Sequence, residues 1–274
     1  MRRLLPSLLA AGVLCLAPTG LARSGETQRV DLELVLAVDV SLSMDTDEQR
    51  LQREGYVAAF LDPAVHRAIA SGAGGRIAVT YIEWAGEHAQ ETVVPWTLID
   101  GPAAARAFAE ELAAAPPSRA RMTSISSAIT YAAAQFEGSR FAGLRRVIDI
   151  SGDGPNNAGR PVAAAREEAL ASGIVINGLP ILAKEDSVSG FFDIARLDDY
   201  YRECVIGGPG AFVVPITASE EFAPAIRQKL ILEISGAEVS SPGATPVRAE
   251  AQPAMDCMVG ERLWQRYIDE RLRE

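Results

Sequence analysis

The sequence contains few of the side chains from which most enzyme active sites are built. Its 274 residues include two histidines, three cysteines and two lysines. His66 and His88 have no HExxH or triad neighbour, so the sequence gives no support for hydrolysis that depends on histidine. No cysteine belongs to a CxxC pair, which argues against redox catalysis and zinc binding. On these grounds we predict no catalytic residues.

Long apolar runs are also scarce, and the one that stands out is at the N-terminus. Arg2 and Arg3 precede the apolar run Leu4–Leu16, and small residues surround Ala22. This layout is typical of a secretory signal peptide, so residues 1–22 are predicted to be removed on export. The run is too short to span a bilayer comfortably, which takes about 20 apolar residues, although an uncleaved anchor is the alternative.

The mature chain is poor in positive charge. The whole sequence carries a formal net charge of −10, and loss of Arg2 and Arg3 leaves −12. Such an acidic chain is not expected to bind nucleic acid or anionic lipid, and it favours cations or basic partners. No later run is apolar enough for a transmembrane segment in the mature chain, so we expect a periplasmic or secreted protein.

Two cysteines remain after the predicted signal peptide. Cys15 lies within the peptide, which leaves Cys204 and Cys257. In an oxidising compartment this pair is expected to form a disulfide, and two separate buried thiols are the alternative.

Patterns typical of buried strands alternate with helical patterns over residues 30–233. Residues 32–39 form a nearly continuous apolar run rich in Val and Leu, which indicates a strand buried on both faces. The alternation predicts an α/β fold, a doubly wound and mostly parallel sheet with helices on both faces. Strands are expected at residues 32–39, 76–83, 91–98 (antiparallel, at an edge), 144–150, 174–179 and 211–216, and helices at 51–60 (ending before Pro63), 102–115, 123–136, 161–171, 193–204 and 220–232.

The end of the chain differs in composition from the rest. Residues 234–254 are rich in Gly, Ser, Pro and Ala and have no apolar period, so they are predicted to form a linker. Residues 255–274 are predicted to contain a charged helix. In this helix Trp264 is a candidate either to dock the helix on the domain or to anchor a partner.

Three loops of the predicted domain carry oxygen ligands. The segment Asp39–Ser43 directly follows the first strand, Thr123 begins a helix, and Asp153 follows the strand at 144–150. In an open α/β sheet, ligands bind outside the carboxyl ends of the strands. Hydroxyls at positions i and i+2 of an extended loop point to the same side, so both serines of the first loop can face one ion. The predicted metal ligands are therefore Asp39, Ser41, Ser43, Thr123 and Asp153.

This set of donors indicates a hard divalent cation. Mg²⁺ takes oxygen ligands in an octahedron at about 2.0–2.1 Å, and Mn²⁺ or Ca²⁺ are the alternatives. Ligation mainly by hydroxyls leaves the ion poorly neutralised, so it continues to attract an anion. We therefore expect a partner protein or peptide, not identified by the sequence, to supply an acidic group at an open position.

The same residues point to a known family. Asp39-x-Ser41-x-Ser43, followed by Thr123 and by Asp153 in Ser-Gly-Asp-Gly, resembles the metal-ion-dependent adhesion site (MIDAS) of von Willebrand factor type A (vWA) domains. The resemblance covers residues 30–233 and is greatest to an exported bacterial group of uncharacterised function. It implies a Rossmann-like doubly wound sheet with one antiparallel edge strand. It also implies that a protein or peptide binds through the metal, usually without catalysis.

The sequence departs from the family pattern in two places. Arg121 and Met122 precede the threonine, where the family has a Gly-Gly or similar turn. Ser151-Gly152-Asp153-Gly154 stands where the family has Thr-Asp-Gly. The extra glycine could shift Asp153 relative to the ion, so the reach of this carboxylate is open.

Several polar residues near these loops have simpler interpretations than metal binding. Asn156 and Asn157 are expected to serve a turn, and Asp149 is expected to be a solvated carboxylate near a strand end. The acidic residues just past the first motif are expected to complement the N-terminus of the next helix: Asp45, Asp47 and Glu48.

A Mg²⁺-dependent phosphohydrolase with Asp39 as its nucleophile is the alternative function. Such enzymes carry a second acid two residues after the nucleophile and a lysine from a later loop. Here Ser41 stands at the first of these positions, and neither Lys184 nor Lys229 is well placed for the second.

Overall fold

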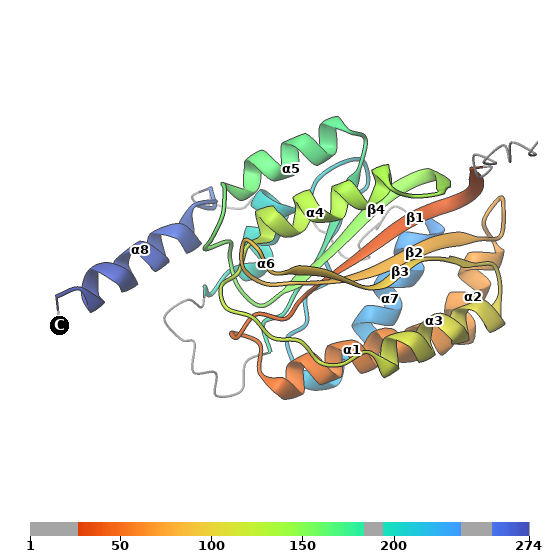
Figure 1. Cartoon of the computed structure of the whole chain (residues 1–274), viewed down its shortest axis with the longest axis horizontal. Coiled ribbons are helices and arrows are strands. Elements are labelled where there is room, and N and C mark those ends of the chain that lie inside the picture. Colours follow the sequence, from red (N-terminus) through yellow and green to blue (C-terminus); the bar gives the residue numbers. More distant parts are fainter. Residues whose placement is uncertain (1–26, 184–193, 237–253, 274) are drawn as a thin grey trace, which may run out of the picture.

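The computed structural model describes residues 27–183, 194–236 and 254–273. The predicted signal peptide and most of the predicted linker lie outside these ranges. Within them, five strands form one sheet in the order β3-β2-β1-β4-β5 (Figure 1). Neighbouring strands are parallel except β2 and β3, which confirms the predicted fold class and its antiparallel edge strand. The strands are β1 (Gln28–Asp39), β2 (Ile77–Trp84), β3 (Gln90–Ile99), β4 (Phe141–Gly152) and β5 (Val175–Pro180).

Helices cover both faces of the sheet (Figure 1). One layer consists of α1 (Thr46–Leu61), α2 (Pro63–Ala70), α3 (Pro102–Ala114) and α7 (Phe222–Ser235). The other consists of α4 (Ile125–Glu137), α5 (Val162–Ala171) and α6 (Leu197–Tyr200), which continues as a π-helical turn, Tyr201–Val205. No helix in the described part of the chain has the length and apolar character needed to cross a membrane.

Strand β1 lies in the middle of the sheet and contributes to both cores. Leu32, Leu34 and Leu36 pack toward the layer of α1, α3 and α7. Val35 and Ala37 pack toward α4 and α5. All five side chains are fully buried, which explains why residues 34–38 of this strand are all apolar and do not alternate.

The predicted ligand loops lie at the edge of the sheet where the order of the strands changes direction, next to β1. From β1 the chain proceeds to β2 on one side, and it later returns to β4 on the other side of β1. The loops that leave the carboxyl ends of β1 and β4 therefore diverge, which is where open α/β sheets bind their ligands. Asp39 ends β1 and Gly152 ends β4, so two of the three predicted ligand loops begin at this edge.

The helix boundaries around the first loop are set by local side-chain bonds. Asp45 caps α1 in a capping box with Glu48, which confirms the predicted role of these acids at the helix N-terminus. The helix ends before Pro63 as expected. However, Pro63 also begins α2, a helix that the sequence analysis missed, because proline is well tolerated at a first helical position.

The strand predicted at residues 211–216 is wrong. This segment forms only two single parallel bridges, Gly178↔Val213 with β5 and Ile181↔Ile216 with the residue just after β5. Pro215 has no N–H to donate, and the two glycines before the segment, Gly208 and Gly210, have positive φ angles of 96° and 72°. The segment therefore lies along the edge of β5 without forming a regular ladder.

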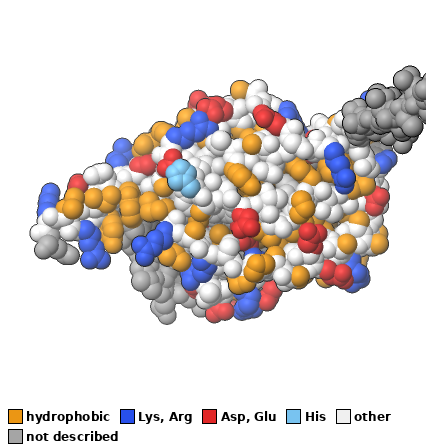
Figure 2. Space-filling model, in the orientation of Figure 1, with side chains coloured by type: hydrophobic (Ala, Val, Ile, Leu, Met, Phe, Trp, Pro, Cys, Tyr) orange, Lys and Arg blue, Asp and Glu red, His pale blue; other side chains and the backbone are white. Residues whose placement is uncertain are grey.

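The tail of the chain is joined covalently to the domain. Cys204 and Cys257 form a disulfide, as predicted, with their Cα atoms 5.4 Å apart. Helix α8 (Val259–Arg271) begins just after the bridge and projects from the body of the protein (Figure 1). Apolar side chains gather along it (Figure 2). On this helix the ring of Trp264 stacks on Tyr267 at a centroid distance of 5.5 Å.

Candidate metal centre

Four of the five predicted ligands form one connected polar group at the carboxyl edge of β1 and β4. The backbone N–H of Ser41 donates to Asp39 Oδ1 at 2.7 Å. The hydroxyls of Ser41 and Ser43 are 2.7 Å apart, and Ser43 Oγ donates to Asp153 Oδ1 at 2.7 Å. Asp39, Ser41 and Asp153 are buried. The structure therefore brings together the first motif and the aspartate that lies more than a hundred residues later.

Thr123 reaches the same edge through backbone contacts. Its N–H donates to Asn157 Oδ1 at 2.8 Å, and the N–H of Asn157 donates to the Thr123 carbonyl at 2.8 Å. The chain just before it is held against the first motif, where the Leu42 N–H donates to the Ala120 carbonyl at 2.9 Å. Thr123 is buried, but in the described residues no hydrogen bond joins its side chain to the other four predicted ligands.

The loop after Asp153 is fixed by two asparagines whose role the sequence analysis underestimated. Asn156 Oδ1 accepts from the Ser126 N–H at 3.0 Å, and its Nδ2 donates to Glu261 of α8 at 2.8 Å. Its backbone N–H donates to Tyr200 Oη at 3.1 Å. Together with Asn157, this residue connects the Asp153 loop to α4, α6 and the tail. A pair of asparagines directly after a candidate ligand was the available signal.

Met122, one of the two departures from the expected pattern, takes a left-handed backbone conformation that glycine favours. Its φ of 71° makes it the one described residue other than glycine with a positive φ. This conformation costs a residue with a side chain about 1–2 kcal/mol, and such strain tends to occur at functional sites. Gly86 makes room for the turn, since a Cβ there would lie 2.6 Å from the Arg121 carbonyl oxygen.

The extra glycine, the other departure, is accommodated without loss of reach. Gly152 is the last residue of β4 and pairs with Pro180, so Asp153 begins the loop one residue further along. The hydrogen bond from Ser43 to Asp153 shows that the carboxylate still reaches the first motif. A side chain at position 152 would not fit, because a Cβ there would lie 2.9 Å from Asp39 Oδ2.

The electrostatics of the site fit a cation. Burial raises the pKa of Asp39 well above its usual range, and the charge of Asp153 raises it further, whereas hydrogen bonds from Ser41 and from the Asp153 backbone lower it. Asp39 Oδ2 is buried and accepts no hydrogen bond from any residue that the structure describes. A divalent ion would balance both carboxylates, and a set of carboxylate and hydroxyl oxygens suits Mg²⁺ rather than softer metals.

The residues present therefore fit the ion, although the site is not rich in acids. Nowhere in the described ranges do three or more His, Cys, Asp or Glu side chains lie together in a way that could hold a metal ion. The candidate centre instead combines two carboxylates with three hydroxyls. A bound ion would supply a positive charge at the surface of the loops, to which an anion can bind.

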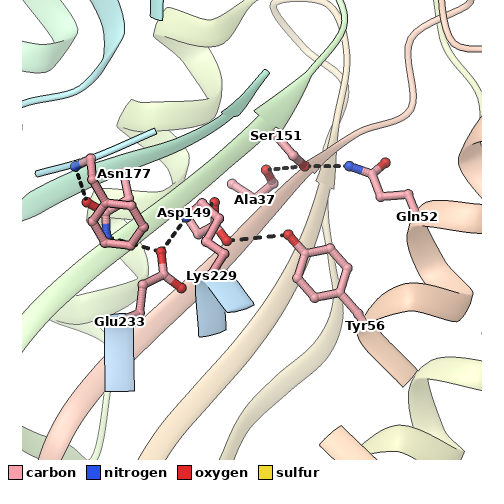
Figure 3. A network of polar contacts seen from close by, with 9 residues as sticks. Ala37, Gln52, Tyr56, Asp149, Ser151, Asn177, Lys229 and Glu233 are labelled. Carbon is pink, nitrogen blue, oxygen red and sulfur yellow. Dashed lines mark hydrogen bonds and ion pairs between the residues drawn. The ribbon is translucent and has the colours of Figure 1, made fainter. Parts of the chain in front are cut away.

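Asp149 is not solvated, which corrects the sequence-based expectation. It is fully buried four residues before Asp153, and its Oδ1 lies 2.7 Å from Lys229 Nζ of α7 (Figure 3). Lys229 also pairs with Glu233, and Asn177 Nδ2 donates to Glu233 Oε1 at 3.1 Å. We refer to Asp149, Lys229 and Glu233, with the contacting side chains of Tyr56 and Asn177, as the buried lysine cluster.

In the buried lysine cluster, the charge of each ionisable group shifts the pKa of its neighbours. Burial alone lowers the pKa of Lys229, but the charges of Asp149 and Glu233 raise it above its ordinary value. Burial and the charge of Asp149 raise the pKa of Glu233 to about 7, against the opposing effect of Lys229. The lysine is therefore held in the core as the counterion of two carboxylates.

Several solved structures share this fold at low sequence identity. Proximal thread matrix protein 1 from the mussel byssus, with a zinc-occupied MIDAS motif, is 13% identical, with a TM-score of 0.56 over 77% of this chain and 49% of that chain. The pilus adhesin SpaC from Lactobacillus rhamnosus GG is 13% identical, with a TM-score of 0.55 over 75% of this chain and 30% of that chain. A von Willebrand factor type A protein from Catenulispora acidiphila is 16% identical, with a TM-score of 0.50 over 75% and 43%.

These likenesses establish the vWA fold. The chain spans about half the length of the mussel protein. No curated protein matches the sequence. A family model described as protein of unknown function (DUF1194) matches residues 29–238, which include every residue of the candidate metal centre. The chain belongs to the DUF1194 family.

Proposed function

We propose that this chain is an exported protein-binding module whose binding depends on a divalent metal ion. The ion is Mg²⁺ in this proposal, held by Asp39, Ser41, Ser43, Thr123 and Asp153. A carboxylate from a partner protein or peptide completes its coordination. The observation that carries the proposal is the chain of 2.7 Å contacts through Ser41, Ser43 and Asp153, beside the buried Asp39 Oδ2 that has no described donor.

The rim of the site supports docking of a partner. Leu42, between the two serines, is 48% exposed and lies at the rim of the site. Arg121, two residues before Thr123, is also exposed. An apolar and a basic side chain beside a cation suit a partner that presents an acidic group next to an apolar one.

The similar structures support metal binding and a binding role for this chain. The zinc-occupied MIDAS motif of the mussel protein supports a divalent ion as the ligand of this chain. SpaC is a pilus adhesin, which supports a binding role rather than a catalytic one. Export is supported by the predicted signal peptide at residues 1–22 and by the Cys204–Cys257 disulfide, since such bonds persist in oxidising compartments.

No observation favours the alternative phosphohydrolase. Such an enzyme needs a lysine near the phosphate. Lys229 is buried between Asp149 and Glu233 in the core, and Lys184 lies outside the described residues. The position two residues after Asp39 carries the Ser41 hydroxyl, which is bonded to Ser43 and cannot replace a carboxylic acid as a proton donor.

Calorimetric titration of residues 23–274 with Mg²⁺ and Mn²⁺ tests the proposal. We expect one saturable site in the wild type and its loss in Asp39→Ala and in Thr123→Ala. The control is Asp47→Ala, which removes an exposed carboxylate from the first turn of α1 and should leave binding unchanged. Absence of binding at millimolar ion, with and without added acetate as a substitute for the partner carboxylate, would require the metal-dependent mechanism to be withdrawn.

A further inference from the structure

A buried tyrosine lies beside the candidate metal centre and is not among its predicted ligands. Tyr201 is the first residue of the π-helical turn Tyr201–Val205, and its side chain is fully buried. Cys204, in the same turn, is bonded to Cys257, so the turn is fixed covalently as well as by packing. Single π-helical turns are rare and are found frequently at functional sites.

Two strands leave space for the ring of Tyr201. A Cβ on Gly178 of β5 would lie 2.7 Å from its Cδ1 atom. A Cβ on Gly152 of β4 would lie 2.9 Å from its hydroxyl oxygen. Glycine inside a buried strand weakens the strand, and it is often found where another group approaches closely. Both neighbouring strands thus have glycine where the tyrosine passes, and its hydroxyl is directed to the end of β4.

The hydroxyl of Tyr201 and the carboxylate of Asp39 both approach Gly152 at the end of β4. Asp39 Oδ2 also lies 2.9 Å from the Cβ position of Gly152, so the two oxygens are less than about 6 Å apart. Both are buried, and within the described residues neither has a hydrogen-bond partner. A buried polar atom without a partner is costly, and two such oxygens at this separation are close enough for one water molecule to bridge them.

The charge state of the tyrosine suits a donor. Burial raises the pKa of Tyr201 well above its ordinary value, and the nearby charges of Asp39 and Asp153 raise it further. A tyrosine hydroxyl is in any case protonated at neutral pH, so it can donate to an oxygen beside the carboxylates.

We propose that Tyr201 is a positioning residue of the metal centre, whose hydroxyl donates a hydrogen bond to a water molecule that it shares with Asp39 Oδ2. This water fixes the orientation of the Asp39 carboxylate toward the ion. The inference rests on the proposed function, because it assigns the tyrosine a role only if the ion binds. It distinguishes Tyr201 from a tyrosine that merely fills space, since only the hydroxyl matters.

Tyr201→Phe tests this assignment, because it removes the hydroxyl and keeps the ring. We expect the Kd for Mn²⁺, measured by calorimetry, to rise about tenfold, as for other groups that orient metal ligands. We expect the Tm in EDTA to stay the same or rise, because the lost hydroxyl had no partner in the described residues.

Tyr56→Phe is the matched control. Tyr56 is equally buried, but its hydroxyl donates to Asp149 Oδ2 at 3.4 Å in the buried lysine cluster. This variant should lower the Tm in EDTA and leave the Kd for Mn²⁺ within twofold of the wild type.

The possible results separate this inference from the proposed function. An unchanged Kd in Tyr201→Phe overturns the role of Tyr201 and leaves the metal centre standing. A variant that fails to fold, or whose Tm falls as in Tyr56→Phe, shows a structural role and also overturns it. If the wild type itself binds no Mn²⁺, the proposed function fails, and this inference fails with it.

Discussion

The buried lysine cluster and the candidate metal centre are both groups of buried carboxylates next to β4, and they differ in what balances their charge. In the cluster, Asp149 and Glu233 share the ammonium group of Lys229. At the metal centre, Asp39 is equally buried, but no ion pair joins it to a basic side chain in the described part of the chain. A carboxylate with an internal counterion contributes to the fold. A buried carboxylate without one needs a proton or a cation from solution, and this difference separates the two regions.

The largest expected effect comes from removing the internal counterion. Lys229→Met leaves two buried carboxylates without a cation, so we expect the free energy of unfolding to fall by about 3–5 kcal/mol. Urea denaturation measures this change. Arg227→Met is the control on the same helix, because Arg227 is about half exposed and its pair with Asp62 is 3.6 Å long. Its effect should stay below about 1 kcal/mol. Equal effects of the two substitutions would contradict the distinction between the regions.

The opposite result is expected for Asp39. Asp39→Asn removes a carboxylate that has no basic partner among the described residues, so the metal-free variant should be at least as stable as the wild type. With Mn²⁺ at 100 times its Kd, the wild type should gain about 2.7 kcal/mol of stability and the variant none. Urea denaturation in EDTA measures the stability of the metal-free proteins, and urea denaturation with Mn²⁺ measures the stabilisation by the ion. A variant that is stabilised by Mn²⁺ as much as the wild type would show that the ion binds elsewhere.

The pH dependence of stability sharpens the comparison within the cluster. Because the folded protein raises the pKa of Glu233 to about 7, the folded state holds a proton that the unfolded chain releases near its ordinary value of 4.5. Its contribution to stability is therefore complete below the unfolded pKa and is lost as the pH rises through 7. We expect the wild type to gain about 1 kcal/mol from this group between pH 8 and pH 6.

Glu233→Gln isolates the contribution of Glu233. The variant keeps an amide in place of the protonated acid, so the pH-dependent gain should shrink by the same amount. Some dependence should remain, because burial also raises the pKa values of Asp39 and Asp149. Parallel stability curves for the wild type and Glu233→Gln between pH 6 and pH 8 would rule out the raised pKa.

The smallest effect concerns strain, which the structure places in the metal-site loops. Met122→Gly should raise the free energy of unfolding by roughly 0.5–1 kcal/mol, because glycine takes the φ of 71° without a steric penalty. The same measurement on Arg121→Gly, next to it but without a positive φ, should show no gain. A loss of stability in Met122→Gly would mean that the methionine side chain contributes more than its backbone conformation costs.

The sequence was sufficient for the five strands that form the sheet and for the first motif, because their signals are local. A strand buried on both faces is apolar throughout, so β1 and its end at Asp39 can be recognised in one stretch of the chain. Ser41 and Ser43 follow at the spacing that places both hydroxyls on one side. Thr123 could be added because it begins a predicted helix, and Asp153 because it follows a predicted strand.

The remaining features depend on contacts between distant segments. Asp149 and Lys229 are 80 positions apart, and nothing near either residue indicates a partner, so the carboxylate was expected to be solvated. The edge segment before α7 has the composition of a strand, but Pro215 prevents a regular ladder. Tyr201 had no signal at all, since its place beside Asp39 follows from two glycines in separate strands.

The most direct test of the central claim is a crystal structure of residues 23–274 grown with Mn²⁺, with anomalous data collected at the manganese edge. The account predicts one strong anomalous peak bounded by Asp39, Ser41, Ser43, Thr123 and Asp153, and the peak should be absent in Asp39→Ala. A peak elsewhere, or no peak at this edge of the sheet at saturating Mn²⁺, would contradict it.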